Sequence, residues 1–593
     1  FCSTSIDKLL MRPLLVPHIF LNLQGITMAV VVVESPAKAK TINKYLGPGF
    51  TVLASYGHVR DLPPKDGSVD PDNDFEMLWE VGAASKKHVK AIADALKDDN
   101  ELILATDPDR EGEAISWHLQ ETLTKRRAIK KDTPVSRVVF NAITKTAVTE
   151  AMKNPRQVDM ELVEAYLARR ALDYLVGFKL SPVLWRRLPG AKSAGRVQSV
   201  CLRIIVDREM EIEVFNAREY WTVSTSLSTP RGQVFDARLT TLGGKRLDKF
   251  DIANSTEAEL AVQAVNSRNL TATSVEAKPA SRNPSAPFMT STLQQEASRK
   301  FGMGARQTMS AAQRLYEAGL ITYMRTDGID MAPEAVHATR DVIEARYGKQ
   351  YVSASPRMYK NKAKNAQEAH ECIRPTELDQ APDKINISDI DQKKLYDLIW
   401  KRTISSQMEA ARMERTTVEI GSPDGQIGLR ATGQVVLFDG FMRVYEEGRD
   451  DSVVDDDDKR LPQITVQDVL VKGSVNPEQH HTQPPPRYTE ASLVKRMEEL
   501  GIGRPSTYAS VVTTIQDRDY VRKEKSRLIP EDKGRLVTVF LSSFFRQYVG
   551  YEFTADLERE LDDVSAGERQ YRTVLKRFWK DFKVAIDEAM DQS

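Results

Sequence analysis

A short apolar run followed at once by acidic residues and then by a helical pattern is the feature that most constrains this fold. Leu102–Ala105 reads as a buried strand, Asp107 and Asp109 follow it, and Glu111 lies in the first turn of an expected helix. This order is typical of an open α/β sheet, whose ligands bind at the carboxyl ends of the strands. We therefore expect the three carboxylates at that edge of a sheet.

Three oxygen ligands this close together suit a hard divalent cation such as Mg²⁺, which takes one or two carboxylates and leaves its other positions to water and phosphate. The spacing also resembles a calcium loop, but position twelve of such a loop is His118 instead of Glu, and a strand precedes the cluster. A solvated acidic loop is the alternative to a metal site.

A second apolar run, Met28–Val33, ends at Glu34, and Pro36 suits the first turn of a following helix. If both strands belong to one sheet, Glu34 joins the other carboxylates. Crowded carboxylates raise one another's pKa, so one of them could hold a proton and act as a general acid. The alternative is a plain surface pair between Glu34 and Lys38, four residues later.

Tyr323 and Arg325 lie two residues apart, and Leu320–Met324 consists of strand-favouring residue types. In an extended segment both side chains would project from one face. A phenol with a pKa of ~10 is a poor nucleophile at neutral pH, and a neighbouring guanidinium favours the phenolate and also binds phosphate oxygens. Tyr323 is thus a candidate nucleophile, with an ordinary strand tyrosine as the alternative.

Seven segments, in order along the chain, resemble the bacterial DNA topoisomerase I family, the type IA enzymes. They are ESPAKAK from Glu34, GHVRDLP from Gly57, DPDREGEA from Asp107, SAGRVQS from Ser193, TYMRTD from Thr322, EAHE from Glu368 and GRPSTYA from Gly503. The resemblance covers residues 28–590, and the first region resembles the Toprim fold that this family shares with primases and some nucleases.

The resemblance implies a transesterase in which Tyr323 attacks a phosphodiester of single-stranded DNA, holds the 5'-phosphate, lets another strand pass and reseals. Relaxation of negatively supercoiled DNA would need no ATP, and the sequence has no Gly-x4-Gly-Lys-Ser/Thr loop. Glu34 or a Mg²⁺ ion could neutralise the leaving 3'-oxygen, with Arg325 and Lys38 on the phosphate. The expected Mg²⁺ ligands are Glu34, Asp107, Asp109 and Glu111.

DNA contacts are also implied by the resemblance. Residues 193–199 read as a phosphate-binding helix start, with an ordinary Ser-capped helix as the alternative. Arg169 and Asp173 could instead form an i,i+4 pair, and aromatic side chains that could stack bases are more often core residues. The expected DNA-binding residues are His58, Arg169, Arg170, Asp173, Phe178, Trp185, Ser193, Ala194, Gly195, Arg196, Val197, Gln198, Arg325, His370, Arg504, Ser506 and Thr507.

We expect a multidomain fold that combines an α/β head with helical and β-rich parts. The predicted parts are an N-terminal extension (1–27), a Toprim head (28–155), a helical base with a winged-helix outline (156–215 and 485–590), a β-rich arch (216–282 and 408–484) and a helical cap that carries Tyr323 (283–407). By resemblance these parts close into a toroid, and the cap lifts to admit DNA.

Composition narrows the function classes. Lys and Arg number 84 and Asp and Glu also 84, so a DNA-binding chain must segregate its positive charge. Three cysteines form no Cys-x-x-Cys pair, although the family usually continues into zinc-binding or basic modules. Residues 14–23 are too short and too interrupted to span a membrane. We expect a monomer in the cytoplasm, associated with the nucleoid.

Two other function classes compete with strand passage. A winged helix alone would fit a DNA-binding regulator without catalysis, but that reading leaves Asp107, Asp109 and Tyr323 unexplained. A Toprim primase or nuclease is the third hypothesis, and a primase needs nucleoside triphosphates and no tyrosyl adduct. The sequence does not separate relaxation from the decatenation typical of topoisomerase III.

Overall fold

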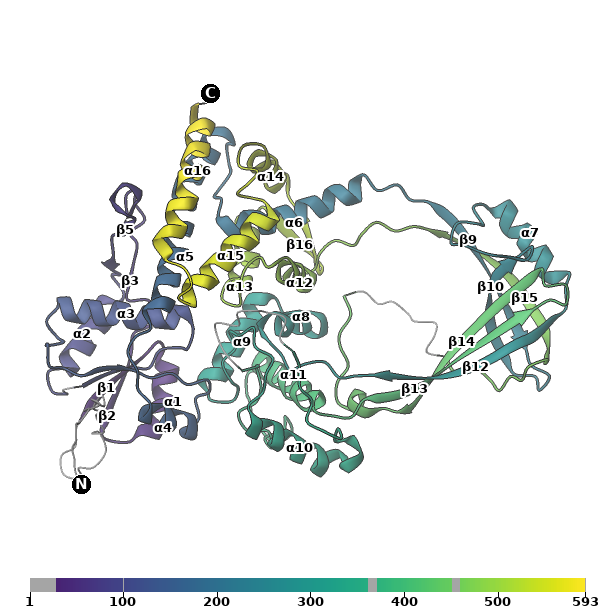
Figure 1. Ribbon diagram of the computed structural model, residues 1–593, viewed down its shortest axis with the longest axis horizontal. Helices are drawn as coiled ribbons and strands as arrows, with labels where there is room; N and C mark the ends of the chain where they lie inside the picture. The colour runs from purple at the N-terminus through teal and green to yellow at the C-terminus, as the bar shows by residue number, and fades with distance from the viewer. Residues whose placement is uncertain (1–27, 100, 361–370, 451–458, 592–593) are drawn as a thin grey trace, which may run out of the picture.

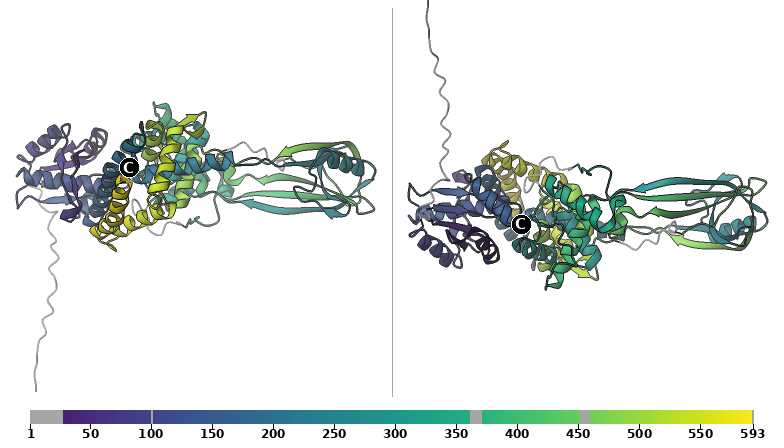
Figure 2. Two further views of the ribbon diagram at one scale, coloured as in Figure 1. Left: turned by 90° about the horizontal axis from the view of Figure 1, so that it is seen from above. Right: turned by 90° about the horizontal axis from the view of Figure 1, so that it is seen from below.

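The computed structural model describes residues 28–99, 101–360, 371–450 and 459–591. The molecule is elongated, with an α/β head at one end, helices in the middle and a β-rich arch at the other end (Figure 1). Seen from above and from below, at right angles to Figure 1, the arch is a narrow extension of the broader helical part (Figure 2).

The head contains a four-stranded parallel sheet in the order β2-β1-β7-β8. Its strands are β1 (Ala29–Val33), β2 (Phe50–Ala54), β7 (Glu101–Leu104) and β8 (Val135–Arg137). The two predicted strands are therefore direct neighbours. All five residues of β1 are buried, as expected for a parallel strand that is covered on both faces.

Helices cover both faces of this sheet. α1 (Pro36–Leu46) and α4 (Lys145–Lys153) contribute to one apolar cluster, while α2 (Lys86–Ala95) and α3 (Arg110–Lys125) contribute to the other. Pro36 occupies the first turn of α1 as predicted. The short strands β3 (Arg60–Asp61) and β6 (Glu80–Val81) pair with each other, as do β4 (Val69–Asp70) and β5 (Glu76–Met77).

The central helical part is built from two distant stretches of sequence that share one apolar core. The first stretch holds α5 (Met160–Arg187) and α6 (Arg196–Glu213). The second holds α12 (Glu490–Leu500), α13 (Tyr508–Asp517), the hairpin β16 (Val521–Glu524) and β17 (Arg527–Pro530), α14 (Asp532–Phe544), α15 (Tyr551–Ser565) and α16 (Tyr571–Asp591). The succession of α12, α13 and the β16–β17 hairpin fits the predicted winged-helix outline.

The arch is an antiparallel sheet that closes on itself, because β10 pairs with both β14 and β9. Its elements are β9 (Glu219–Ser228), β10 (Val234–Leu242), β11 (Lys245–Arg246), α7 (Ser255–Asn266), β12 (Leu270–Arg282), β13 (Ala411–Gly421), β14 (Ile427–Phe438) and β15 (Val469–His481). Along β10 buried and exposed residues alternate, so one face of the strand contributes to the arch core.

The remaining helices are α8 (Thr290–Phe301), α9 (Ala305–Glu317), α10 (Pro333–Tyr347) and α11 (Ile390–Ser406). They share an apolar cluster with one face of the head sheet, so head and helices pack against each other. Every helix in the described ranges is too short or too polar to cross a lipid bilayer.

The prediction of an extended strand at Leu320–Met324 is wrong. Ile321 alone forms an isolated bridge, with Pro375. The backbone N–H groups of this segment donate to separate loops: Thr322 N to Arg374 O at 2.9 Å and Tyr323 N to Asn141 O at 2.8 Å. Tertiary contacts override the strand propensity of the residue types here.

His118 on α3 makes the stability of the head dependent on pH. Its ring is fully buried, packs against Trp79 and accepts a hydrogen bond at Nδ1 from Arg60 Nε at 2.7 Å. Burial, together with the charge of Arg60, lowers the pKa of His118 to about 2. The unfolded chain, with a pKa near 6.5, takes up the proton that the folded state excludes. The contribution of His118 to the free energy of unfolding should therefore fall by ~2 kcal/mol between pH 6.5 and pH 5, whereas the raised pKa of Glu34 shifts stability in the opposite direction over this range.

Denaturant unfolding of the wild type at several pH values measures this slope. Between pH 6.5 and pH 5 the variant His118→Asn, which cannot titrate there, should gain ~2 kcal/mol of stability relative to the wild type, whereas His337→Asn, at an exposed position of α10, should keep the wild-type slope. Equal slopes for the wild type and His118→Asn would contradict the prediction.

Candidate active site

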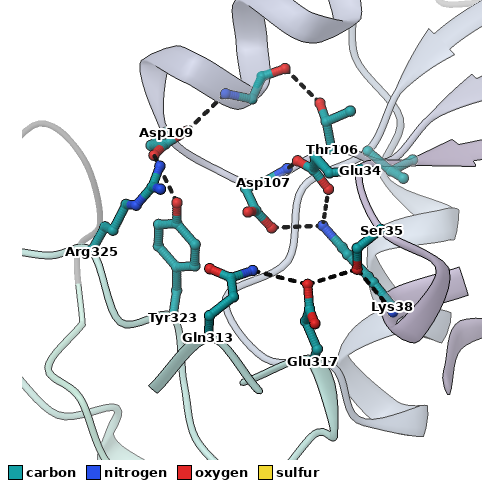
Figure 3. A network of polar contacts seen from close by, with 12 residues as sticks. Glu34, Ser35, Lys38, Thr106, Asp107, Asp109, Gln313, Glu317, Tyr323 and Arg325 are labelled. Carbon is teal, nitrogen blue, oxygen red and sulfur yellow. Dashed lines mark hydrogen bonds and ion pairs between the residues drawn. The ribbon is translucent and has the colours of Figure 1, made fainter. Parts of the chain in front are cut away.

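Acidic side chains from two neighbouring strands meet at the carboxyl edge of the head sheet (Figure 3). Glu34 directly follows β1, and Asp107 lies three residues beyond the end of β7. Because β1 and β7 are parallel neighbours, both carboxylates lie at the same edge. The backbone N–H of Asp107 donates to a carboxylate oxygen of Glu34, so the predicted meeting of the two segments is confirmed.

Lys38 joins the two carboxylates from the first turn of α1. Ser35 caps this helix by accepting from the N–H of Lys38 at 3.2 Å. The Nζ of Lys38 lies 2.9 Å from Glu34 Oε2 and 2.7 Å from Asp107 Oδ1, and its side chain is 1% exposed. The alternative of a plain surface pair between Glu34 and Lys38 is therefore wrong.

Two of these carboxylates, both partly buried, have unlike proton affinities. Burial and the neighbouring charge of Asp107 raise the pKa of Glu34 to about 7, even though Lys38 opposes this shift. For Glu111 burial acts in the same direction, but the hydrogen bond from His58 and the charge of Arg325 outweigh it and lower the pKa to about 2. Glu34 therefore holds a proton far more readily than Glu111.

Tyr323 reaches this edge from the loop after α9. Its hydroxyl donates to Asp109 Oδ2 at 2.7 Å, while Asp109 Oδ1 caps α3 by accepting from Gly112 N at 2.8 Å. Tyr323 is 0% exposed. Burial and the charge of Asp109 raise the pKa of the phenol well above its usual value. Arg325 shifts this pKa downward, as predicted, but is outweighed in the present arrangement.

Arg325 bridges two of the carboxylates that follow β7. Its Nη1 lies 3.3 Å from Asp109 Oδ2 and 2.5 Å from Glu111 Oε2. The other oxygen of Glu111 is 2.9 Å from His58 Nε2, and the His58 ring stacks on Tyr166 with centroids 5.6 Å apart. Tyr323 and Arg325 thus contact the same carboxylate, although they do not lie on a strand.

Gly112 and Arg137 shape the loop that carries Asp107, and neither was expected. A Cβ at Gly112 would lie 2.1 Å from the carbonyl oxygen of Asp107, so only glycine fits at this close approach. Arg137 on β8 is fully buried and donates to the carbonyls of Thr106 at 2.8 Å and Asp107 at 2.7 Å. An arginine in a short strand carries no sequence signal for such a role.

Glu317 of α9 connects this helix to the head, and Gln313 supports it; both were also missed. Glu317 Oε1 accepts hydrogen bonds from Ser35 Oγ at 2.6 Å and from Gln313 Nε2 at 3.1 Å (Figure 3). The carbonyl of Glu317 accepts from Thr41 Oγ1 at 2.8 Å. Gln313 and Glu317 are spaced i,i+4, and Glu317 lies six residues before Tyr323. This spacing is the signal that could have suggested the two residues.

The four predicted metal ligands match Mg²⁺ in chemical kind, because all are carboxylates. Within the described residues, however, no group of three or more His, Cys, Asp or Glu side chains is arranged to hold an ion. Lys38 contacts Glu34 and Asp107, and Arg325 contacts Asp109 and Glu111. Internal cations thus occupy the positions next to the carboxylates in this arrangement.

Three of the predicted DNA-binding arginines converge on α15. Arg169 Nη2 lies 2.8 Å and Arg196 Nη1 2.5 Å from the two oxygens of Glu558, and Arg504 Nη2 lies 2.7 Å from Asp562 Oδ2. Burial alone would raise the pKa of Glu558, but the charges of the three arginines outweigh burial and lower this pKa far below its usual value. Sequence reasoning missed both carboxylates.

The alternative of an i,i+4 pair between Arg169 and Asp173 is wrong, because Asp173 pairs with Arg196 Nε at 3.1 Å. Arg170 binds Asp61 through two contacts of 2.8 and 3.1 Å.

The helix start at residues 193–199 is present. α6 begins at Arg196 with Gly195 as its N-cap and no capping side chain, so the alternative of a Ser-capped helix is wrong. Ala194 and Val197 are buried. The backbone of Ser193 is bonded to the hydroxyl of Tyr520, and Gln198 Nε2 donates to Ser193 O at 3.2 Å.

The remaining predicted DNA contacts differ in exposure. Trp185 is 57% exposed, whereas Phe178 packs on the helical core and stacks on Tyr174 with centroids 4.4 Å apart. Thr507 Oγ1 accepts from Arg504 N at 2.9 Å, and Ser506 is half-buried. His370 lies outside the described residues.

Comparisons with known proteins agree with this geometry. Residues 157–576 match the DNA topoisomerase family, and residues 29–143 match the Toprim domain family. DNA topoisomerase 1 of Zymomonas mobilis is 57% identical over 569 residues, which cover 95% of this chain and 46% of that protein. DNA topoisomerase 1 of Rickettsia bellii is 50% identical over 575 residues, or 95% of this chain and 72% of that one.

Full-length topoisomerase I from Thermotoga maritima has a similar solved structure. The TM-score is 0.80 at 36% sequence identity, over 95% of this chain and 91% of that chain. The present chain spans about half the length of the first of the curated relatives and about three quarters of the second. By sequence and by structure, the chain belongs to the family of bacterial type IA DNA topoisomerases, which are isomerases.

Proposed function

We propose that this chain relaxes negatively supercoiled DNA without ATP, by cleaving one strand through a covalent bond between Tyr323 and the 5'-phosphate. The observation that carries the proposal is the 2.7 Å contact between the hydroxyl of Tyr323 and Asp109. A phenol from the middle of the chain thereby lies beside the carboxylates of the head. DNA binding without chemistry gives no reason for this contact.

In the cleavage step, the phenolic oxygen of Tyr323 forms a bond to phosphorus while the bond from phosphorus to the 3'-oxygen breaks. Asp109 accepts the phenolic proton, since it already accepts the hydrogen bond. Glu34 gives a proton to the leaving 3'-oxygen, and a pKa of about 7 suits a general acid at neutral pH. One ester replaces another, so religation is the reverse of the same step and needs no ATP.

Arg325 and Lys38 are the cationic side chains that would contact the phosphate. The planar guanidinium of Arg325 can bind two phosphate oxygens and stabilises the phenolate of Tyr323. Lys38 lies between Glu34 and Asp107 and would share its charge with the phosphate as the strand enters. Both cations would then exchange part of their carboxylate contacts for contacts with DNA.

Mg²⁺ is the cofactor we propose, with Glu34, Asp107, Asp109 and Glu111 as the residues that would hold it. The support is the carboxylate donor set, in a domain of the Toprim family. When bound, the ion would supply positive charge that positions the 3'-hydroxyl for religation.

We propose that the bound strand follows α5 and the start of α6. Trp185 is the exposed aromatic residue that would stack a base, and His58 lies beside Glu111 at the active-site edge. Arg169, Arg196 and Arg504 would exchange Glu558 and Asp562 for phosphates. The other proposed contacts are Arg170, Asp173, Phe178, Ser193, Ala194, Gly195, Val197, Gln198, Arg325, His370, Ser506 and Thr507.

A moving gate is required, because Tyr323 has no exposed surface. We propose that the head (28–155), base (156–215 and 485–590), arch (216–282 and 408–484) and cap (283–407) close into a toroid, and that the cap lifts from the head to admit DNA. One chain supplies every part of this cycle, so a monomer suffices. A chromosomal substrate places the enzyme with the nucleoid in the cytoplasm.

Tyr323→Phe removes the nucleophile and little else. We expect the wild type to relax negatively supercoiled plasmid in steps with Mg²⁺ and without ATP, and to leave a phosphotyrosyl adduct when denatured during turnover. The variant should show neither activity, whereas its affinity for single-stranded DNA should stay within about twofold, or ~0.4 kcal/mol. Tyr316→Phe is the matched control, since that buried ring packs on Tyr323. Relaxation by Tyr323→Phe would refute the assignment.

Lys38→Met should destabilise the head by about 3 kcal/mol or more, because it leaves Glu34 and Asp107 buried without their cation. Denaturant unfolding measures the change. Lys40→Met is the matched control on the same helix, where Lys40 is exposed, and it should change stability by less than ~0.5 kcal/mol. Equal stability of the two variants would show that Lys38 does not offset the charge of the carboxylates.

Gly319→Ala should separate the cap from the head. At this position φ is +77°, and a Cβ would lie 2.4 Å from the carbonyl oxygen of Ile143 in the head. Hydrogen exchange of the Tyr323 amide, which donates to Asn141 O, should become faster. Gly302→Ala, with φ of +66° and no atom within 4 Å of its Cβ position, has the same backbone penalty without the clash. Equal exchange in the two variants would count against a gate at this interface.

A further inference from the structure

Tyr56 is an exposed aromatic residue beside the active-site edge. It follows β2, is 56% exposed and has a φ of +62°, a left-handed conformation that bulky side chains rarely adopt. Its neighbours tie it to the strand end that carries Glu34: Ser55 N donates to Val33 O at 2.8 Å, and Gly57 N donates to Glu34 O at 3.1 Å. The backbone at Tyr56 is therefore attached to the strand end that carries Glu34.

A second ring supports Tyr56. His88 of α2 stacks on it, with ring centroids 3.8 Å apart and an interplanar angle of 22°. The start of α2 is fixed near the site, because Ser85 Oγ donates to the carbonyl of His58 at 3.1 Å and His58 binds Glu111. Tyr56 belongs to none of the apolar clusters of the described residues, so burial of apolar surface does not explain the tyrosine.

Two lysines lie beside this ring pair. Lys86 and Lys87 are exposed in the first turn of α2, which holds no acidic residue. Neither lysine has a carboxylate partner within 4.0 Å among the described residues, whereas Lys90 of the same helix pairs with Asp94. Aromatic faces next to cationic side chains are the combination by which proteins bind single-stranded nucleic acids: the ring stacks a base and the cations contact the backbone.

We propose that Tyr56 stacks a base of the single-stranded DNA, with the neighbouring phosphates against Lys86 and Lys87. The inference rests on the proposed function for its substrate and adds a strand contact on the β2 side of the active-site edge. It also explains the backbone at Tyr56, since glycine or asparagine adopts a φ of +62° more readily than tyrosine. Base stacking accepts any base, because every base has an aromatic face. Purines have the larger face, so the contact would favour a purine at this position near the cleaved bond.

Abasic scanning tests the stacking contact. The complete chain carrying Tyr323→Phe is titrated, by fluorescence anisotropy, into single-stranded oligonucleotides that each lack one base at a different position. We expect removal of one particular base to weaken binding about tenfold. Adding Tyr56→Asn should weaken binding of the intact oligonucleotide about tenfold and abolish the response to that abasic position, while Tyr56→Phe should behave as the parent.

The thermal stability of Tyr56→Asn separates a stacking role of Tyr56 from a structural one. Asparagine tolerates the left-handed conformation, so the thermal midpoint of Tyr56→Asn should equal or exceed that of its parent. An abasic profile that is the same with and without Tyr56→Asn overturns the proposal, and so does a parent for which no single base matters.

Salt dependence tests the lysines. For single strands the slope of log affinity against log salt falls by about 0.7 for each phosphate contact, so Lys86→Gln with Lys87→Gln should reduce its magnitude by up to about 1.4. Lys125→Gln with Lys130→Gln, two exposed positions at the end of α3 and in the loop that follows it, should leave the slope unchanged. Equal slopes for the two double variants refute the phosphate contact. These assays measure binding alone, whereas failure of the proposed function would appear as absence of relaxation and adduct in the wild type.

Discussion

The hydrogen bond from Tyr323 to Asp109 is the contact on which the rest of the site depends. It joins residues 214 positions apart in the chain and lies in a buried setting, where unpaired charge is unfavourable. Around it, Lys38 and Arg325 face Glu34, Asp107, Asp109 and Glu111, so carboxylates outnumber these two cations. The raised pKa of Glu34 is one response to this excess, and a divalent ion or a change of partners on DNA entry would be another.

In the helical centre of the molecule, buried carboxylates are paired with a larger number of arginines. There Glu558 and Asp562 of α15 hold four arginines that come from α3, α5, α6 and the turn before α13. A chain with equal numbers of acidic and basic residues can thereby keep guanidinium groups close together until phosphates replace the carboxylates. The same carboxylates fix the relative positions of helices that are far apart in sequence.

Local sequence patterns predicted the parts of the fold that local interactions determine. The run at Met28–Val33, Pro36 and the carboxylates after β7 gave the correct strands, helix starts and sheet edge, because strand burial and helix capping act over a few residues. Leu320–Met324 was predicted incorrectly, since its partners, Asn141 and Arg374, belong to other loops. Arg137 and Glu558 were missed for the same reason: their roles arise only when distant segments meet.

The arch meets each of its neighbours through a pair of adjacent strands. Arg282 at the end of β12 pairs with Ala411 at the start of β13, where the chain leaves for the cap and returns from it. Glu219 of β9 likewise pairs with His481 of β15, where the chain arrives from α6 and departs toward α12. Each connection is thus a two-stranded ribbon, and twisting such a ribbon would swing everything beyond it as a unit. Large displacements at the far end would then need no strand of the closed sheet to part from its neighbour.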